Sequence, residues 1–118
     1  MDEFRVTLRR LAISDDRLVA SLSAGGPDNA DASGLDPRAH ALVQIGALIA
    51  LDAGPQSYAT AVDAARQAGA SSEEIVGVLV AAIPVVGAPR VVSAAPKLGL
   101  ALGYDLDAAL ELGSTLAG

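Results

Sequence analysis

The chain has 118 residues, enough for one domain with a hydrophobic core and too few for two. It carries 8 Lys and Arg against 14 Asp and Glu, a formal charge of −6, which argues against a nucleic-acid binder because phosphates attract a basic face. The lack of cysteine excludes disulfides, thiolate metal sites and thiol redox chemistry.

Small aliphatic residues dominate the composition, which is 52% hydrophobic but only 3% aromatic. Ala-rich sequence favours helices, and small side chains let helices approach closely. Each small residue buries little area, so a short chain of this kind often gains stability by oligomerisation. The mean hydropathy of +0.43 agrees with a buried subunit interface.

The N-terminal part, residues 1–24, is predicted to form two helices. The first covers 3–12, and the second is capped by Ser14 and runs to Ala24. The start of the chain is charged and lacks the apolar core of a signal peptide, so we expect a cytoplasmic protein. Residues 25–36 are rich in Gly, Pro, Asp, Asn and Ser and predict a loop.

Residues 37–118 are predicted to form the helical core. A helix begins at Asp36-Pro37, the next covers Pro55 to Ala68, and a capping box from Ser71 to Glu74 starts the one after. Pro84 is expected to end or kink the helix near Ile83. The following helix is expected to begin at Pro89, to be interrupted by Pro96 and to end at Gly103. Asp105 is expected to cap a last helix that reaches Leu112.

The apolar stretch from Ile75 to Pro89 raises the question of a membrane span. Its 15 uncharged residues fall short of the roughly 20 that a spanning helix needs, and Pro84 and Gly87 interrupt it. A buried helix without membrane contact is therefore expected. No stretch alternates apolar and polar residues as a strand would, so the predicted fold is an all-α, single-domain orthogonal bundle of about six helices.

Four segments, in this order, resemble the carboxymuconolactone decarboxylase family, which includes the alkylhydroperoxidase D-like proteins. They are LDPRAHALVQIGALIAL at 35–51, AVDAARQAGA at 61–70, SSEEIVGVLVAA at 71–82 and GAPR at 87–90. The resemblance covers about half of the chain. It implies an all-α domain that assembles into trimers or hexamers.

The same resemblance implies which chemistry is missing. Peroxidase members carry a Cys-x-x-Cys four residues before a His on the helix that ends at the place of Gly69. Counted back from Gly69, these places hold Gly54, Ser57 and Ala61, none of which forms a thiolate or relays a proton. Decarboxylase-like members keep the His that Ala61 replaces here. The chain is therefore predicted not to be a thiol peroxidase.

Two residues are candidates for acid–base roles. His40, the only histidine, could act as a general base or a substrate ligand, since histidine is the side chain suited to proton transfer near neutral pH, or it could be a partly exposed helix residue. Tyr58 could offer its hydroxyl to a ligand, or its ring could lie in the core with its tip in water.

Two more are candidates for substrate binding. Arg90, after Gly-x-Pro, could clamp a carboxylate, or it could pair with an acidic residue across a subunit interface. Ser57 lies beside Tyr58 and has no nearby base in the sequence. One histidine and scattered carboxylates predict no metal site and no cofactor.

Two functions remain open from the sequence. In the first, the protein is a cofactor-independent lyase or isomerase, or a binding protein, whose ligand is a small organic acid or lactone. In the second, it is a non-catalytic module on the same scaffold that oligomerises or binds a partner.

Overall fold

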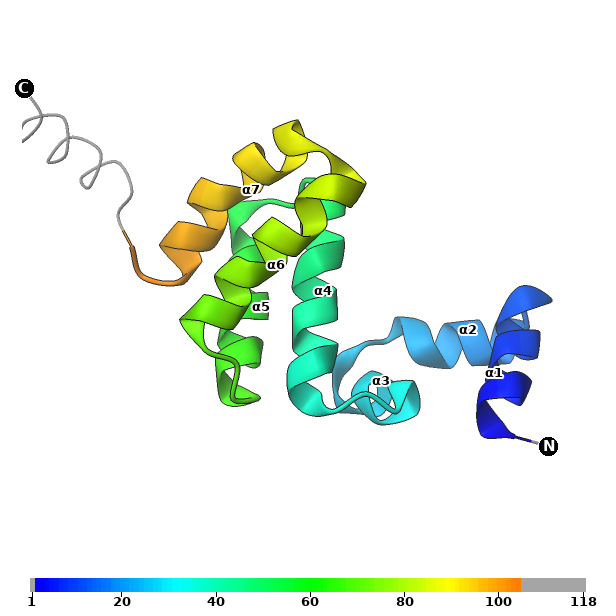
Figure 1. Cartoon of the computed structure of the whole chain (residues 1–118). Coiled ribbons are helices and arrows are strands. Elements are labelled where there is room, and N and C mark those ends of the chain that lie inside the picture. The colour runs from blue at the N-terminus through cyan, green and yellow to red at the C-terminus, as the bar shows by residue number, and fades with distance from the viewer. Residues whose placement is uncertain (1, 105–118) are drawn as a thin grey trace, which may run out of the picture. The chain divides into compact units, whose positions relative to one another are not determined.

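The computed structural model describes residues 2–104 and is all-α over this range, as the sequence predicts (Figure 1). The described residues form seven helices and no strand. The chain divides into two compact units, 1–36 and 37–118. The last helix expected from Asp105 lies outside the described residues.

The first unit contains α1 (Glu3–Ala12), α2 (Asp16–Ser23) and α3 (Gly26–Ser33), and none of their residues is fully buried. Asp15, rather than Ser14, caps α2, since its carboxylate accepts the Leu18 N–H at 3.1 Å. The Arg10 side chain donates to the same carboxylate at 3.1 Å and, with that cap, holds the pKa of Asp15 below its usual value.

The predicted loop over 25–36 is wrong for most of its length, because Gly26–Ser33 forms α3. Its composition is polar, but it carries helix signals at both ends. Pro27 stands in the first turn, and Gly34 follows the helix with a left-handed φ of 71°. The Asn29 side chain donates to the Leu22 carbonyl at 2.8 Å, which ties α3 to α2.

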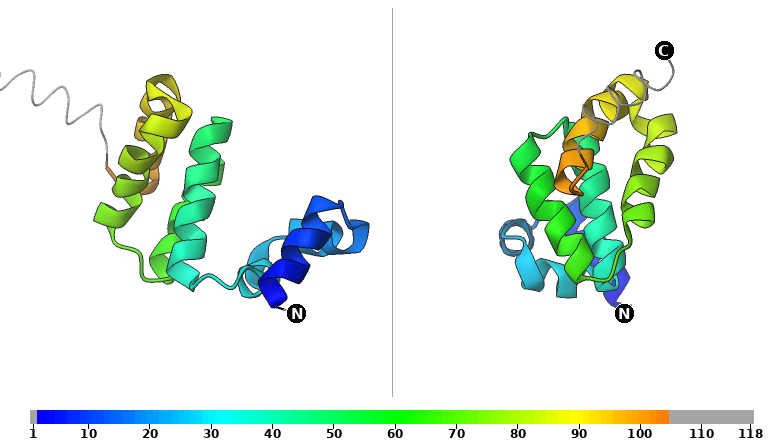
Figure 2. Two further views of the ribbon diagram at one scale, coloured as in Figure 1. Left: turned by 45° about the vertical axis from the view of Figure 1, so that its right-hand side comes forward. Right: turned by 90° about the vertical axis from the view of Figure 1, so that its left-hand side faces the viewer.

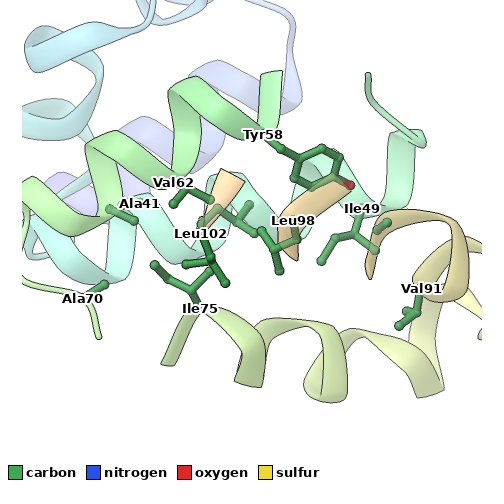
Figure 3. Close-up of a cluster of buried hydrophobic side chains, with 12 residues drawn as sticks. Ala41, Ile49, Tyr58, Val62, Ala70, Ile75, Val91, Leu98 and Leu102 are labelled. Carbon is green, nitrogen blue, oxygen red and sulfur yellow. The ribbon is translucent and has the colours of Figure 1, made fainter. Parts of the chain in front are cut away.

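The second unit is built from α4 (Pro37–Leu51), α5 (Pro55–Gln67), α6 (Ser72–Val86) and α7 (Ala88–Ala101). α4 packs on α5 and α6, and α7 packs on the same two helices, so the four surround one core (Figure 2). The buried side chains are aliphatic apart from one tyrosine (Figure 3): Ala41, Ile45, Ile49, Tyr58, Val62, Ala65, Ala70, Ile75, Val91, Ala94, Leu98 and Leu102.

The turns between these helices follow local sequence signals. Gly69, after α5, has a φ of 93°, which a residue with a side chain rarely adopts. The capping box of α6 forms as predicted: the Glu74 N–H donates to Ser71 Oγ and the Ser71 N–H donates to Glu74 Oε1, both at 3.0 Å. α6 therefore begins where the sequence predicts.

The helix end predicted near Pro84 and the interruption predicted at Pro96 are wrong, whereas a kink at Pro84 stays a prediction. α6 continues past Pro84 to Val86, and α7 runs through Pro96 to Ala101. Both prolines are exposed, as are Val80 and Val92 four residues before them. The carbonyl that loses its helical donor therefore lies on the solvent side of each helix, where water can satisfy it. None of the helices in residues 2–104 has the length and apolarity needed to cross a bilayer.

Candidate functional site

A pocket of about 490 Å³ lies on the surface that α4 and α5 share. On α4 the lining residues follow one another at spacings of three and four residues, as 44, 47 and 48 do. On α5 they form two neighbouring pairs, 56–57 and 60–61, which lie one helical turn apart. Each set therefore occupies one face of its helix. The lining residues are Gln44, Ala47, Leu48, Gln56, Ser57, Thr60 and Ala61.

All seven lining side chains are neutral. Two amides and two hydroxyls can donate and accept hydrogen bonds, and two alanines and one leucine form the remaining surface. The Thr60 hydroxyl donates to the Gln56 carbonyl at 3.2 Å, so its oxygen is left to accept from a ligand. This lining suits a neutral molecule with a carbonyl or hydroxyl group and some apolar surface.

The pocket includes two of the three positions that the sequence resemblance matches to the reactive residues of peroxidase members. Ser57 and Ala61 stand one turn apart on α5, and both line the pocket, whereas Gly54 lies before the helix. At these two positions a hydroxyl and a methyl group line the pocket.

Tyr58 follows Ser57 but faces the core, because neighbouring residues on a helix point about 100° apart. Its side chain is 0% exposed and packs among the aliphatic residues of α4, α5 and α7 (Figure 3). Its hydroxyl has no hydrogen-bond partner among the described residues. Burial, with a contribution from the Asp52 carboxylate, raises the pKa of Tyr58 above its usual value.

Arg90 faces an acidic residue of its own chain. Its Nη1 lies 4.0 Å from Asp52 Oδ2, at the end of α4. Asp52 Oδ1 accepts a hydrogen bond of 2.7 Å from the Ser93 hydroxyl and one of 3.3 Å from Lys97 Nζ. These two bonds, Ser93 first, hold the pKa of Asp52 below its usual value.

The cluster of Asp52, Arg90, Ser93 and Lys97 joins the α4–α5 turn to α7. Lys97 also donates to the Ala53 carbonyl at 2.9 Å. Asp52 has a φ of 53°, a left-handed conformation that Asp tolerates better than most residues. The contacts of this cluster position the turn, and none of its four residues lines the α4–α5 pocket.

The structure separates the four residues singled out from the sequence. His40 lies half-buried in the first turn of α4, and neither it nor Tyr58 nor Arg90 lines the α4–α5 pocket. Of the four, Ser57 alone does so. The roles suggested for His40, Tyr58 and Arg90 stay predictions.

Sequence reasoning missed Gln44, Gln56 and Thr60. Gln44 carried a signal, because it is the one polar side chain between Ala41 and Leu51, in an otherwise apolar helix. Gln56 and Thr60 share a face of α5 with Ser57 and Ala61, but only the packing of α4 shows that this face borders a pocket. Among residues 2–104 no group of His, Asp or Glu has a metal-binding arrangement.

Comparison with known proteins supports the resemblance stated above. The model of the carboxymuconolactone decarboxylase family matches residues 20–98, which include all of α4, α5 and α6 and most of α7. Searches of curated proteins and of solved structures gave no match. Because the family match spans more than half of the sequence and the described residues are all-α, this chain belongs to the carboxymuconolactone decarboxylase family.

Proposed function

We propose that this protein binds a small neutral organic molecule of the lactone class in the α4–α5 pocket, without a cofactor. The observation that carries the proposal is the lining itself, with amide and hydroxyl groups beside apolar side chains. A volume of about 490 Å³ lies in the range of pockets for small molecules.

A lactone fits this lining better than a carboxylate does. The ring carbonyl can accept from the amide groups of Gln44 and Gln56, and the ring carbons can lie on Ala47 and Ala61. A carboxylate would lose part of its hydration at this lining without gaining a cation, which costs free energy. Arg90, the cation suggested from the sequence, faces Asp52 instead.

Binding is favoured over lyase or isomerase activity on this chain. Those reactions need a group that gives or takes a proton at the substrate, and the polar side chains of the lining are amides and hydroxyls, with no histidine or carboxylate among them. The second candidate function, a non-catalytic module, is equally compatible with a lining that has no acid–base group. It differs from the proposed function because it requires no ligand in the pocket.

An NMR titration with γ-butyrolactone tests the proposal. The amide signals of Gln44, Ser57 and Thr60 are expected to shift, with a dissociation constant in roughly the millimolar range for so small a ligand. Ala61→Leu should weaken binding at least tenfold, because the larger side chain occupies the pocket.

The matched control is Ala59→Leu on the same helix. Ala59 is exposed and lies about 200° around α5 from Ala61, outside the lining. It should leave the lactone titration unchanged. The binding proposal fails if γ-butyrolactone shifts none of the lining amides, or if both variants weaken the response equally.

A further inference from the structure

A groove of about 470 Å³ lies on the exposed side of α6 and shares no lining residue with the α4–α5 pocket. The residues at 73, 76, 77 and 80 recur at spacings of three and four, so they lie along one face of the helix. The groove therefore runs from a carboxylate at the α6 start to two valines. Its full lining is Ser72, Glu73, Val76, Gly77, Val80 and Tyr104.

The turn at the end of α7 brings Tyr104 to this groove. Gly103 has a left-handed φ of 95°, and the Tyr104 N–H donates to the Gly99 carbonyl at 2.9 Å, which reverses the chain at the helix end. The Arg66 side chain donates to the Leu102 carbonyl at 2.9 Å and holds the same turn from α5. Tyr104 therefore lines the groove in a fixed backbone position.

The Glu73 carboxylate has no cationic partner among the described residues, in contrast to that of Glu74. The Glu74 carboxylate accepts from the Ser71 N–H at 3.0 Å and lies 3.6 Å from Arg38 Nη1. None of the ion pairs formed within residues 2–104 includes Glu73. The groove thus holds a negative charge beside apolar surface.

We propose that this groove, the α6 groove, binds a small organic cation with an apolar body, of the class of the primary alkylammonium ions. The ammonium group pairs with the Glu73 carboxylate, and the aromatic ring of Tyr104 can add a cation–π contact. The alkyl chain lies along α6 over Gly77 and contacts Val76 and Val80. The proposal does not depend on ligand binding in the α4–α5 pocket.

The apolar part of the α6 groove has room for a short alkyl chain. Residues 73 and 80 are separated by about 10 Å along the helix axis, at 1.5 Å per residue. A side chain placed at Gly77 would meet no atom within 4 Å, so the space over the middle of the groove is open. Val76 and Val80 border this space and are exposed, so an alkyl chain that covers them removes apolar surface from water.

Charge selects a cation over an anion in this groove. An anion would meet the Glu73 carboxylate on a chain with a net charge of −6. The positive end of the α6 dipole acts in the opposite sense, but it amounts to about half a charge spread over a first turn that also carries Glu74. We expect a cation to bind roughly fivefold more tightly than a neutral molecule of the same skeleton, because exposed ion pairs and cation–π contacts are each weak.

An NMR titration with three ligands of equal chain length tests the proposal. Hexylammonium should shift the amide signals of Glu73, Gly77 and Val80, hexan-1-ol should do so with lower affinity, and hexanoate with the lowest. High salt should reduce the difference between the amine and the alcohol, because salt screens the ion pair. Equal affinities for the amine and the alcohol would overturn the proposal. It is also overturned if no ligand shifts these signals, as expected if a second copy or residues 105–118 cover the groove.

Three variants test the assigned contacts. Glu73→Gln should lower the affinity for hexylammonium to that for hexan-1-ol, while Asp63→Asn, which removes the same charge from an exposed site on α5, should leave the preference unchanged. Gly77→Leu should weaken both ligands by roughly fivefold or more, because the leucine side chain takes the place of the alkyl chain. Leucine favours a helix more than glycine does, so this variant is expected to fold. The proposal fails if Asp63→Asn acts like Glu73→Gln, or if Gly77→Leu changes neither affinity.

Discussion

The Ser93 hydroxyl donates a hydrogen bond of 2.7 Å to Asp52 Oδ1 and joins two residues 41 positions apart. The contact fixes the α4–α5 turn against α7. Because α5 starts directly after this turn, the cluster around Asp52 also determines where Ser57 and Ala61 stand opposite α4.

The pH dependence of the stability of the Asp52→Asn variant tests whether the charge of this cluster stabilises the fold. The pKa of Asp52 is lowered in the folded protein, so its charge stabilises the fold above the ordinary aspartate pKa of about 3.9. That contribution is lost as the pH falls through the lowered value. Asparagine also tolerates a left-handed φ, so the variant changes mainly the charge.

We therefore expect Asp52→Asn to lower the melting temperature at pH 7, and we expect the difference from the natural chain to disappear as the pH falls through the lowered pKa of Asp52. Ser93→Ala, which removes the largest cause of the lowered pKa, should show a smaller loss in the same direction. Melting temperatures measured from pH 2 to 7 check both. A difference that stays constant over this range would show that the carboxylate charge is not the cause.

Tyr58→Phe tests the buried hydroxyl. This group has no hydrogen-bond partner among the described residues, so its removal should raise the free energy of unfolding by about 1 kcal/mol. Urea unfolding measures the change, and Tyr104→Phe on an exposed residue is the control. A loss of stability in Tyr58→Phe would mean that the hydroxyl does make a hydrogen bond in solution.

Ile49→Ala tests the core of the second unit. Ile49 is 0% exposed, whereas Leu51 on the same helix is 74% exposed. The buried truncation should cost about 2–5 kcal/mol of unfolding free energy, and Leu51→Ala should change it by less than about 0.5 kcal/mol. Equal effects of the two substitutions in urea unfolding would contradict the assigned core.

Ser71→Ala tests the start of α6. It removes the hydroxyl that accepts the Glu74 N–H and should cost about 1 kcal/mol of unfolding free energy. Ser72→Ala changes the next residue, which makes no capping bond in this box, and should cost less. If both substitutions have the same effect on urea unfolding, the capping bond contributes little.

Local signals made much of the fold predictable. The starts of α4, α5 and α6 are encoded by Pro37, Pro55 and the Ser71–Glu74 box, and the end of α5 by Gly69. Each of these depends on a few neighbouring residues. α3 was missed because its polar composition resembles a loop, although its end signals are those of a helix.

The site was less predictable because it depends on distant residues. The effects of Pro84 and Pro96 depend on whether the affected carbonyl faces solvent, which only the packed helices decide. The pairing of Arg90 with Asp52 joins residues far apart in the sequence. Ser57 could be placed near the pocket through the family pattern, whereas Gln44 required the packing of α4 on α5.

The most direct test of the proposed function compares γ-butyrolactone with γ-hydroxybutyrate, the open-chain acid of the same carbon skeleton. Both are titrated into the isotope-labelled protein by NMR, and the signals of the lactone itself are followed over time. We predict that the lactone shifts the amides of Gln44, Ser57 and Thr60 and stays intact, while the acid shifts none of them. Ring opening above the buffer rate, or acid-induced shifts centred on His40 and Arg90, would contradict a neutral binding pocket.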